Sequence, residues 1–473
     1  MMHIEQIYTG CLAQGAYYIQ SENEVAIIDP LREVEPYMAK AKAAGATIKY
    51  VFETHFHADF VSGHIDLARE TGAQIVYGPN AVTGFEAYIA KDNETFKVGR
   101  VTIKVLHTPG HTMESVCYLL NDEDGKETAL FSGDTLFIGD VGRPDLAQKA
   151  SGLTQEGLAG ILFDSLRTRI MVLPDDVIVY PAHGAGSACG KNMSKETTDT
   201  LGNQKKYNYA LRPNMTREEF ITEVTRGLTA PPVYFPLNVK MNREGYESFE
   251  KVLSQGTQPL TPEAFEAAAN STGAILLDTR DPLVFAKAFV PNSINIGING
   301  SFAPWVGALV PDINQQILLI TEEGREEEVV TRLARVGYDH AIGYLKGGIK
   351  AWQAAGNETD SIVSLTVDEL AKNISNDSLI KILDVRKATE HYAEHILDAE
   401  NLPLDDINSN MARLDKNQTY YVHCAGGYRS MIFNSMLRAR GFTNLVDAQG
   451  GFKAMKDSGK FKISDYLCPS TMP

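Results

Sequence analysis

Three side chains of types that commonly bind metal ions occupy alternate positions in the stretch from Thr54 to His64. They are His55, His57 and Asp59. In an extended or tightly turned segment, alternate residues point to the same side, so the two imidazoles and the carboxylate can converge. Nitrogen and carboxylate oxygen ligands together suit zinc, iron or manganese. The stretch is therefore a candidate metal site.

Further ligand-type residues occur later in the first half of the chain. His111, Asp134 and His183 each closely follow an apolar run that we expect to be a strand. A Pro-Gly pair directly before His111 favours a turn at that point. Because active sites are often assembled from loops at strand ends, these three residues are candidates for the same metal site.

Two other residues of this half allow more than one interpretation. Arg143, in the segment Gly139–Asp145, can clamp a carboxylate or a sulfur oxyanion, or it can form a surface salt bridge. Cys189, which follows His183 by six residues, can hold sulfur near a metal, or it can be a small buried thiol.

A second candidate site lies near the C-terminus, between an apolar run and an expected helix. Cys424 opens a loop that ends at Arg429. A cysteine in this position faces backbone N–H groups and a helix N-terminus, and with the arginine these favour the thiolate. Gly426 and Gly427 permit the turn that such a loop requires. The four residues that separate Cys424 from the arginine suit a single sulfur atom rather than a phosphate. They are Ala425, Gly426, Gly427 and Tyr428.

Length and composition limit the number of domains and the classes of function that these sites can serve. The chain has 473 residues, of which 44% are hydrophobic and 22% charged, so we expect two to four globular domains. The net charge of −16 argues against binding to nucleic acid or an anionic membrane. The sequence has no apolar run of about 18 residues and no signal-type N-terminus. The five cysteines do not suggest a disulfide framework, so we expect a cytoplasmic protein.

Strands and helices alternate irregularly over the first 255 residues, which predicts a mixed α and β domain. Residues 230–260 are rich in Pro, Gly and polar residues, which indicates a boundary. The expected strands are Ala16–Ile19, Val25–Asp29, Gln74–Tyr77, Val101–Leu106, Thr128–Phe131 and Val177–Tyr180, and the expected helices are Val34–Ala44 and Val61–Thr71.

The remainder of the chain contains a repeat of about one hundred residues. Ile275–Arg280 is echoed by Ile382–Arg386, and Gly347–Trp352 is echoed by Gly450–Met455. Each copy alternates strands with helices, which predicts an α/β unit with a largely parallel sheet. In the first copy the loop Ile320–Glu326 has no cysteine and contains acidic residues, so it cannot carry sulfur covalently.

The ligand pattern of the first half resembles that of the metallo-β-lactamase superfamily, which implies an αββα fold. The family motif is His-x-His-x-Asp-His, followed by a distant His, a bridging Asp and a last His. Phe60 stands where the family usually has a histidine that binds a second metal. A phenyl ring has no electron pair to donate, so we expect a single metal. Two histidines and one carboxylate with open faces are typical of non-haem Fe(II) oxygenases, whereas zinc hydrolases often use a second metal.

Within this superfamily, the sequence resembles the persulfide dioxygenases most closely. That resemblance implies one Fe(II) per chain, although zinc is an alternative occupant in purified protein. It also places Arg143 beside a groove for the thiol substrate. The spacing alone leaves open whether His57 binds the metal. The implied ligands are His55, His111 and Asp134, and the implied surrounding residues are His57, Asp59 and His183.

Both copies of the repeat resemble the rhodanese family, and Cys424 with its loop matches the family's active-site loop. The resemblance implies that Cys424 carries sulfane sulfur, with Arg429 assisting. The first copy is then a degenerate rhodanese. It would serve as a spacer, a docking surface or a wall of the substrate path, or as inert packing material.

We therefore predict three domains: a persulfide dioxygenase domain (1–255), a cysteine-less rhodanese (260–357) and an active rhodanese (360–473). The expected function is oxidation of a low-molecular-weight thiol persulfide, such as glutathione persulfide, to sulfite. Cys424 would transfer sulfane sulfur to or from thiosulfate, as part of sulfide detoxification. The expected partners are the persulfide, dioxygen, sulfite and thiosulfate, with no nucleic acid and no membrane, while a homo-oligomer stays open. The alternatives are a dinuclear zinc thioester hydrolase of the glyoxalase II type fused to a sulfurtransferase, and a non-catalytic sulfur sensor.

Overall fold

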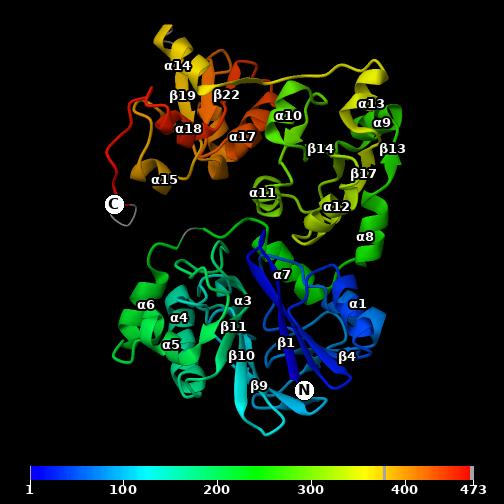
Figure 1. Ribbon diagram of the computed structural model, residues 1–473, viewed down its shortest axis with the longest axis vertical. Helices are drawn as coiled ribbons and strands as arrows, with labels where there is room; N and C mark the ends of the chain where they lie inside the picture. The colour runs from blue at the N-terminus through cyan, green and yellow to red at the C-terminus, as the bar shows by residue number, and fades with distance from the viewer. Residues whose placement is uncertain (1, 229, 377–379, 469–473) are drawn as a thin grey trace. The chain divides into compact units, whose positions relative to one another are not determined.

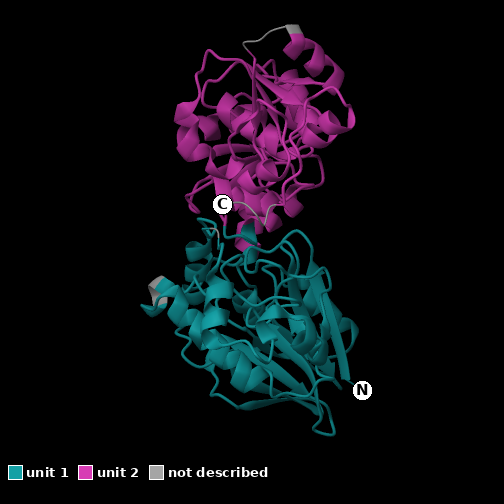
Figure 2. Cartoon of the chain, turned by 90° about the vertical axis from the view of Figure 1, so that its left-hand side faces the viewer, with its two compact units in different colours: residues 1–249, 334–337 teal, residues 250–333, 338–473 magenta. Residues whose placement is uncertain are grey.

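The computed structural model describes residues 2–228, 230–376 and 380–468. The last five residues of the third predicted domain lie outside the described residues. The chain divides into two compact units (Figure 2). The first contains residues 1–249 and 334–337, and the second contains residues 250–333 and 338–473.

Two mixed sheets form the centre of the first unit (Figure 1). In spatial order, the first sheet contains β1 (Met2–Thr9), β2 (Gln14–Ser21), β3 (Glu24–Ile28), β4 (Thr47–Phe52), β5 (Gln74–Tyr77) and β6 (Tyr88–Ile89). The second contains β12 (Asp199–Thr200), β11 (Ile178–Pro181), β10 (Glu127–Gly133), β9 (Val116–Asn121), β8 (Val101–His107) and β7 (Thr95–Val98).

Strand β9 shows how the sequence buries both faces of a sheet. Val116, Tyr118 and Leu120 belong to the core between the two sheets. Cys117 and Leu119, which point the other way, belong to a second core that includes helical residues. The helices that bury apolar residues in that second core include α4 (Gln155–Ser165) and α6 (Arg217–Thr225).

On the outer face of the first sheet, α1 (Glu35–Ala43) and α2 (His64–Thr71) contribute Tyr37 and Leu67 to a third core. The layers are therefore helices, sheet, sheet and helices, and the expected αββα fold is confirmed. The remaining helices of this unit are α3 (Gln148–Ser151), α5 (Leu201–Tyr207) and α7 (Phe235–Glu244).

The predicted strands of the first half coincide with β2, β3, β5, β8, β10 and β11 to within two residues at either end. The predicted helix Val61–Thr71 begins later, at His64, because Ser62 forms a β-bridge with Leu31. Residues 230–260 contain α7 and α8 (Phe249–Gly256), so this segment is more regular than its composition suggested.

The second unit contains two parallel five-stranded sheets with the same strand order, one for each copy of the repeat. The first contains β13 (Pro259–Leu260), β17 (Ala341–Leu345), β16 (Ile317–Ile320), β14 (Ile275–Asp278) and β15 (Ile294–Asn295). The second contains β18 (Val363–Leu365), β22 (Leu445–Ala448), β21 (Tyr420–His423), β19 (Lys381–Asp384) and β20 (Glu400–Asn401).

Helices follow these strands in the same order in both copies. The first copy has α9 (Pro262–Thr272), α10 (Pro282–Lys287), α11 (Phe302–Leu309), α12 (Glu326–Ala334) and α13 (Gly348–Ala354). The second has α14 (Val367–Asn376), α15 (Ala388–Ala393), α16 (Ile407–Asn410), α17 (Tyr428–Arg438) and α18 (Gly451–Asp457). The predicted α/β repeat with parallel sheets is confirmed.

The repeat extends to individual side chains. Asp278 accepts hydrogen bonds from the Nε of Arg280 at 2.9 and 3.0 Å, and Asp384 accepts the same pair from Arg386 at 2.9 and 3.0 Å. Each of these ion pairs closes the turn that leaves a buried strand.

None of the helices within the described ranges is both long and apolar enough to cross a membrane.

Gly451 provides a test of how tightly the second copy is built around its cysteine. Its φ is +57°, and a Cβ there would lie 2.4 Å from the carbonyl oxygen of Cys424. Gly459 has a similar φ of +65°, but a Cβ there would have no atom within 4 Å. The two positions therefore differ in available space and hardly in backbone strain.

We expect Gly459→Ala to lower the free energy of unfolding by about 1–2 kcal/mol, the cost of a left-handed residue. Gly451→Ala should lower it by about 1–3 kcal/mol more, because the loop of Cys424 must also move. Denaturant unfolding of the two variants measures the difference. An equal loss of unfolding free energy in the two variants would mean that the loop of Cys424 can move at no measurable cost.

Candidate metal centre and cysteine loop

Three buried side chains converge where strands of the first unit end. His55 closely follows β4, His111 lies in the turn after β8, and Asp134 directly follows β10. The Nε2 atoms of His55 and His111 lie 3.8 and 3.5 Å from Oδ2 of Asp134. One ligand atom of each of the three residues lies within 4.8 Å of the other two. The structure thus brings together the three predicted ligands.

These distances fit a metal ion. Two atoms that each bind one ion at about 2.1 Å lie roughly 3–4 Å apart. The Oδ2 atom of Asp134 is buried and has no hydrogen-bond partner in the described part of the chain, so it is available as a ligand. Two imidazoles and one carboxylate form the donor set of many mononuclear iron sites.

Hydrogen bonds orient both histidines with Nε2 towards Asp134. The Nδ1–H of His111 donates to the carbonyl oxygen of Arg143 at 2.9 Å. Thr54 donates its hydroxyl hydrogen to Asp29 at 2.8 Å, so it accepts from Nδ1 of His55 at 3.0 Å. In both rings the proton therefore resides on Nδ1, which leaves the lone pair of Nε2 for a metal.

The charges of the site also suit a cation. Burial and the neighbouring His57 lower the pKa of His55 well below its ordinary value, so the ring is neutral. Burial alone would raise the pKa of Asp134, but His183, His55 and His111 outweigh it and lower the pKa far below its usual range. A neutral imidazole and an ionised carboxylate are the forms that bind metal ions.

His183 lies between two carboxylates. Its Nδ1–H donates to Oδ1 of Asp134 at 2.7 Å, and its Nε2 lies 2.8 Å from Oδ2 of Asp59. Burial opposes protonation of this ring, yet the two carboxylates raise its pKa well above the ordinary value. His183 therefore holds both acids in place as a cation when no metal is bound.

Phe60 fills the position at which the family motif has a histidine. Its side chain is fully buried, and its ring centre lies 4.3 Å from that of His57 and 6.4 Å from that of His183. The Nε2 of His57 lies 3.1 Å from Asp29 and 3.6 Å from Glu53, and neither ring nitrogen has a hydrogen-bond partner among the described residues. If His57 binds the metal, it does so through Nδ1.

Cys189 is buried and also lies near the candidate metal site, so the two expectations from the sequence do not exclude each other. Its thiol lies within 4.8 Å of ligand atoms of Asp59 and His183. Burial, together with Asp59 and Asp134, raises the pKa of this thiol well above its ordinary value, so it is protonated. A protonated thiol is a poor metal ligand and a weak nucleophile. The short spacing between His183 and Cys189 indicated that the thiol could lie near the site, but it could not show which side chains surround the thiol.

Arg143 is almost fully buried rather than on the surface. It forms two hydrogen bonds of 2.7 Å with Asp145, and its third nitrogen donates to the carbonyl oxygen of Ala188 at 3.2 Å. The loop of Arg143 is thereby fixed next to His111. The salt bridge considered from the sequence is therefore present, with Asp145, but it is buried rather than on the surface, and a role in substrate binding stays a prediction.

The second unit holds Cys424 at the end of β21, directly before α17. The backbone N–H of Gly427 donates to Sγ of Cys424 at 3.1 Å, and Gly427 has a φ of +104° that turns the chain into the helix. The expected arrangement of cysteine, turn and helix N-terminus is present. A backbone amide directed at the sulfur favours its anionic form.

Arg429 has an acidic partner that the sequence did not reveal. Its guanidinium forms hydrogen bonds of 2.6 and 2.9 Å with Glu390 in α15, and this carboxylate raises the pKa of the arginine further. Arg429 is therefore held in one orientation, and part of its charge is offset. Because Glu390 is 39 residues away along the chain, no local motif indicates the pair.

The corresponding loop of the first copy begins with Thr321, directly after β16. Thr321 stands where the second copy has Cys424, because β16 and β21 are the middle strands of their sheets. Gly324 provides the turn with a φ of +85°, and Arg325 pairs with Glu328 of its own helix at 2.8 Å. The strand end and the glycine turn of the second copy are thus retained, but the nucleophile is not.

Comparisons with known proteins agree with this division. Residues 9–183 match the model of the metallo-beta-lactamase superfamily, and residues 261–355 and 366–458 each match the rhodanese-like domain. A solved metallo-beta-lactamase from Staphylococcus aureus is 32% identical, with a TM-score of 0.64 over 72% of this chain and 98% of that one.

Two groups of curated enzymes match the first unit about equally well. A probable hydroxyacylglutathione hydrolase of Schizosaccharomyces pombe is 31% identical over 37% of this chain and 66% of its own length. The mitochondrial persulfide dioxygenase of Homo sapiens is 33% identical over 38% of this chain and 66% of its own. The chain spans only 58–66% of the length of the first four such relatives.

The different surroundings of His111 and His57 lead to a prediction about metal content. We expect His111→Ala to remove nearly all bound metal, because it deletes one of the three predicted ligands. His57→Ala should instead weaken metal affinity about 10- to 100-fold, which is the usual effect of losing a residue that surrounds the ligands without binding the metal. Elemental analysis after dialysis against graded chelator measures both. Equal loss in the two variants would identify His57 as a direct ligand through Nδ1.

Proposed function

Because the chain belongs to the metallo-β-lactamase superfamily and carries two rhodanese-like domains, we propose that it oxidises a low-molecular-weight thiol persulfide to sulfite. The proposed metal is one non-haem iron per chain, held by His55, His111 and Asp134. The second part of the proposal is that Cys424 transfers sulfane sulfur. The three proposed domains are those expected from the sequence.

The observation that carries the oxygenase part is the donor set at Asp134. Two imidazoles and one ionised carboxylate converge there, and the family's further histidine is replaced by Phe60. Iron(II) bound by such a set can activate dioxygen and still leave positions for a substrate. The net reaction consumes a persulfide RSSH, dioxygen and water, and yields the thiol RSH, sulfite and two protons.

The surrounding residues would keep this site rigid. His183 fixes the carboxylate of Asp134 through a 2.7 Å hydrogen bond, and Arg143 fixes the ring of His111 through its carbonyl oxygen. Cys189 lies beside Asp59 and His183, where it could receive sulfur once its proton is removed. We propose sulfur handling for Cys189 and substrate contact for Arg143 as additional roles.

At Cys424, the thiolate would attack the outer sulfur of a persulfide. The S–S bond of the donor breaks, the donor leaves as a thiolate, and a cysteine persulfide forms. Sulfite then attacks the outer sulfur and leaves with it as thiosulfate, which regenerates the thiol of Cys424. The N–H of Gly427 would stabilise the sulfur anion in both steps, because it already points at Sγ.

A dinuclear zinc thioester hydrolase is the second candidate. The similarity to hydroxyacylglutathione hydrolases favours it, and Asp59, His183 and Cys189 offer three further donor atoms. The protonated thiol and the buried Phe60 count against a second metal. The number of metal ions per chain separates the two candidates.

Oxygen uptake by iron-reconstituted protein tests the proposal. With a thiol persulfide as substrate, we expect uptake of one dioxygen for each sulfite formed. In the Cys424→Ser variant, uptake should persist while thiosulfate formation falls at least about 10²-fold, as on removal of a covalent nucleophile. Cys468→Ser is the control for the loss of a thiol, because this cysteine is exposed and belongs to neither candidate site.

Two results would contradict the proposal. Absence of oxygen uptake with one iron bound per chain would reject the dioxygenase, and rapid hydrolysis of a glutathione thioester with two zinc ions would establish the hydrolase. Unchanged thiosulfate formation in Cys424→Ser would reject the sulfur transfer.

A further inference from the structure

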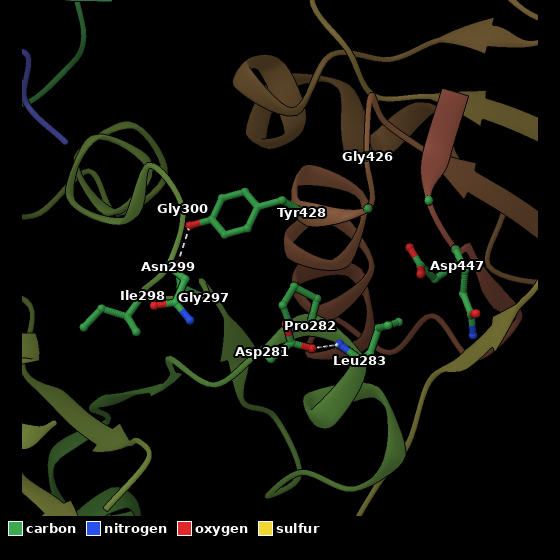
Figure 3. Close-up of a pocket in the computed structure, with 13 residues that line it drawn as sticks. Asp281, Pro282, Leu283, Gly297, Ile298, Asn299, Gly300, Gly426, Tyr428 and Asp447 are labelled. Carbon is green, nitrogen blue, oxygen red and sulfur yellow. Dashed lines mark hydrogen bonds between the residues drawn. The ribbon is translucent and has the colours of Figure 1, made fainter. Parts of the chain in front are cut away.

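A pocket of about 300 Å³ lies inside the second unit, beside the loop of Cys424. Both copies of the repeat contribute to its wall (Figure 3). The first copy provides Asp281, Pro282, Leu283, Gly297, Ile298, Asn299 and Gly300, and the second provides Gly426, Gly427, Tyr428, Asp447, Gln449 and Gly450. The cysteine-less copy therefore forms half of a cavity next to the reactive cysteine.

The two halves of the wall are joined by specific contacts. The hydroxyl of Tyr428, in the cysteine loop, donates to the carbonyl oxygen of Gly297 at 2.7 Å. Its ring lies so close to Gly300 that a Cβ there would be 2.4 Å from a ring carbon. The Oγ of Ser435 in α17 accepts from the backbone N–H of Asn295 at 2.9 Å.

A shared apolar cluster supports these contacts. Phe285 and Phe289 of the first copy stack on each other at 4.1 Å and pack with Met431 of α17. The helix that begins at the cysteine loop is therefore buried against the first copy, and the wall of the pocket is preformed. These contacts argue against the first copy being only a spacer.

The polar groups of the wall are acidic or neutral. Among its 13 described residues there is no lysine, arginine or histidine, whereas Asp281 and Asp447 are carboxylates. Asn299 and Gln449 add amides. Arg325 lies behind Asn299, but its charge is paired with Glu322 and Glu328.

Asp447 is the buried member of the two acids. In the described part of the chain its carboxylate accepts hydrogen bonds only from two hydroxyls, those of Ser430 at 2.7 Å and Ser364 at 2.9 Å. Burial raises its pKa to about 6, and the hydrogen bonds from the two hydroxyls oppose this rise. A buried carboxylate without a cationic partner favours a ligand that supplies the positive charge.

The pocket is close to the sulfur. Asp447 pairs in register with Val422, and Cys424 lies two residues beyond, about 6.6 Å further along the strand direction. Gly427, whose N–H points at Sγ, is itself part of the wall. A thiol with two or three carbon atoms can therefore place one end near a carboxylate and the other near the sulfur.

We propose that this pocket selects the thiol partner of Cys424 by binding a protonated amine at its carboxylates, so that the preferred substrates are small aminothiols. The apolar side chains of Pro282, Leu283 and Ile298 would contact the carbon chain. Anions such as sulfite and thiosulfate gain nothing from these carboxylates, so they would reach the sulfur from outside the pocket. This inference rests on the proposed sulfur transfer at Cys424.

The reaction at the pocket is an exchange of one sulfur atom. The aminothiolate RS⁻ attacks the outer sulfur of the Cys424 persulfide, whose S–S bond breaks. A new S–S bond forms in RSSH, which keeps the proton of the outer sulfur, and Cys424 leaves as the thiolate. The reverse direction, from RSSH to Cys424, uses the same contacts and needs no oxidant or reductant.

The test compares three short thiols with thiosulfate as the sulfur donor. Cysteamine carries a positive charge, β-mercaptoethanol is neutral and mercaptoacetate is negative, and kcat/KM is expressed per thiolate present. We expect cysteamine to exceed β-mercaptoethanol about tenfold, since a charge-assisted hydrogen bond has this effect. Mercaptoacetate should be the poorest acceptor of the three.

Substitution in the pocket should remove this preference. Asp281→Asn keeps a residue that caps α10 equally well, and it should lower the preference for cysteamine at least about threefold. Asp447→Asn should do the same and provides a second, independent variant. Glu266→Gln, which removes an exposed carboxylate of α9 outside the pocket, is the matched control and should keep the wild-type preference.

Each outcome decides one question. Sulfite release from thiosulfate, with transfer to all three thiols and no preference for the amine, would overturn the inference and leave the sulfur transfer intact. A preference that persists in both aspartate variants would also overturn it. Absence of sulfite release with any acceptor, cyanide included, would instead reject the proposed function of Cys424.

Discussion

The buried carboxylate of Asp134 is the group on which the first site depends. It lies in a region where burial alone would keep it protonated, and it is ionised because three histidines surround it. Its Oδ1 is held by His183, whereas its Oδ2 faces His55 and His111 without a hydrogen-bond partner among the described residues. One oxygen is thus fixed by the protein and the other is left for a cation, which is the arrangement that a metal site requires.

The same principle of positioning recurs in both units. Each functional side chain lies where a buried strand ends, so the strand provides rigidity and the loop provides direction. Asp134 follows β10 directly, as Cys424 follows β21. In each site a backbone atom also orients a reactive group: the carbonyl of Arg143 orients His111, and the amide of Gly427 points at Cys424. Backbone atoms serve this purpose well because they move little.

Short sequence patterns predicted those parts of the two sites that depend on neighbouring residues. The spacing of His55 from His57, the Pro-Gly pair before His111 and the glycines after Cys424 are short-range features, and the loops they predict are present. The repeat and its alternation of strands with helices likewise predicted two matching parallel sheets. The contacts that tune reactivity join distant residues. Glu390 with Arg429, Cys189 with Asp59, and Tyr428 with Gly297 are separated by 39 to 131 positions, so no spacing reveals them.

The single ion of the proposed function has a physical basis in Phe60 and Cys189, although the site has six potential donors. Phe60 removes a donor and fills its space against His57, while Cys189 supplies sulfur only as a protonated thiol. To bind a second cation, the thiol would have to ionise beside two carboxylates, and the cationic His183 would have to give up its proton. A metal at His55, His111 and Asp134 needs neither change, because the ring of His55 is neutral, Asp134 is ionised, and the Nδ1 of His111 is already the nitrogen that donates a hydrogen bond. Under the proposed function, this position would therefore fill at lower free-energy cost than the second one.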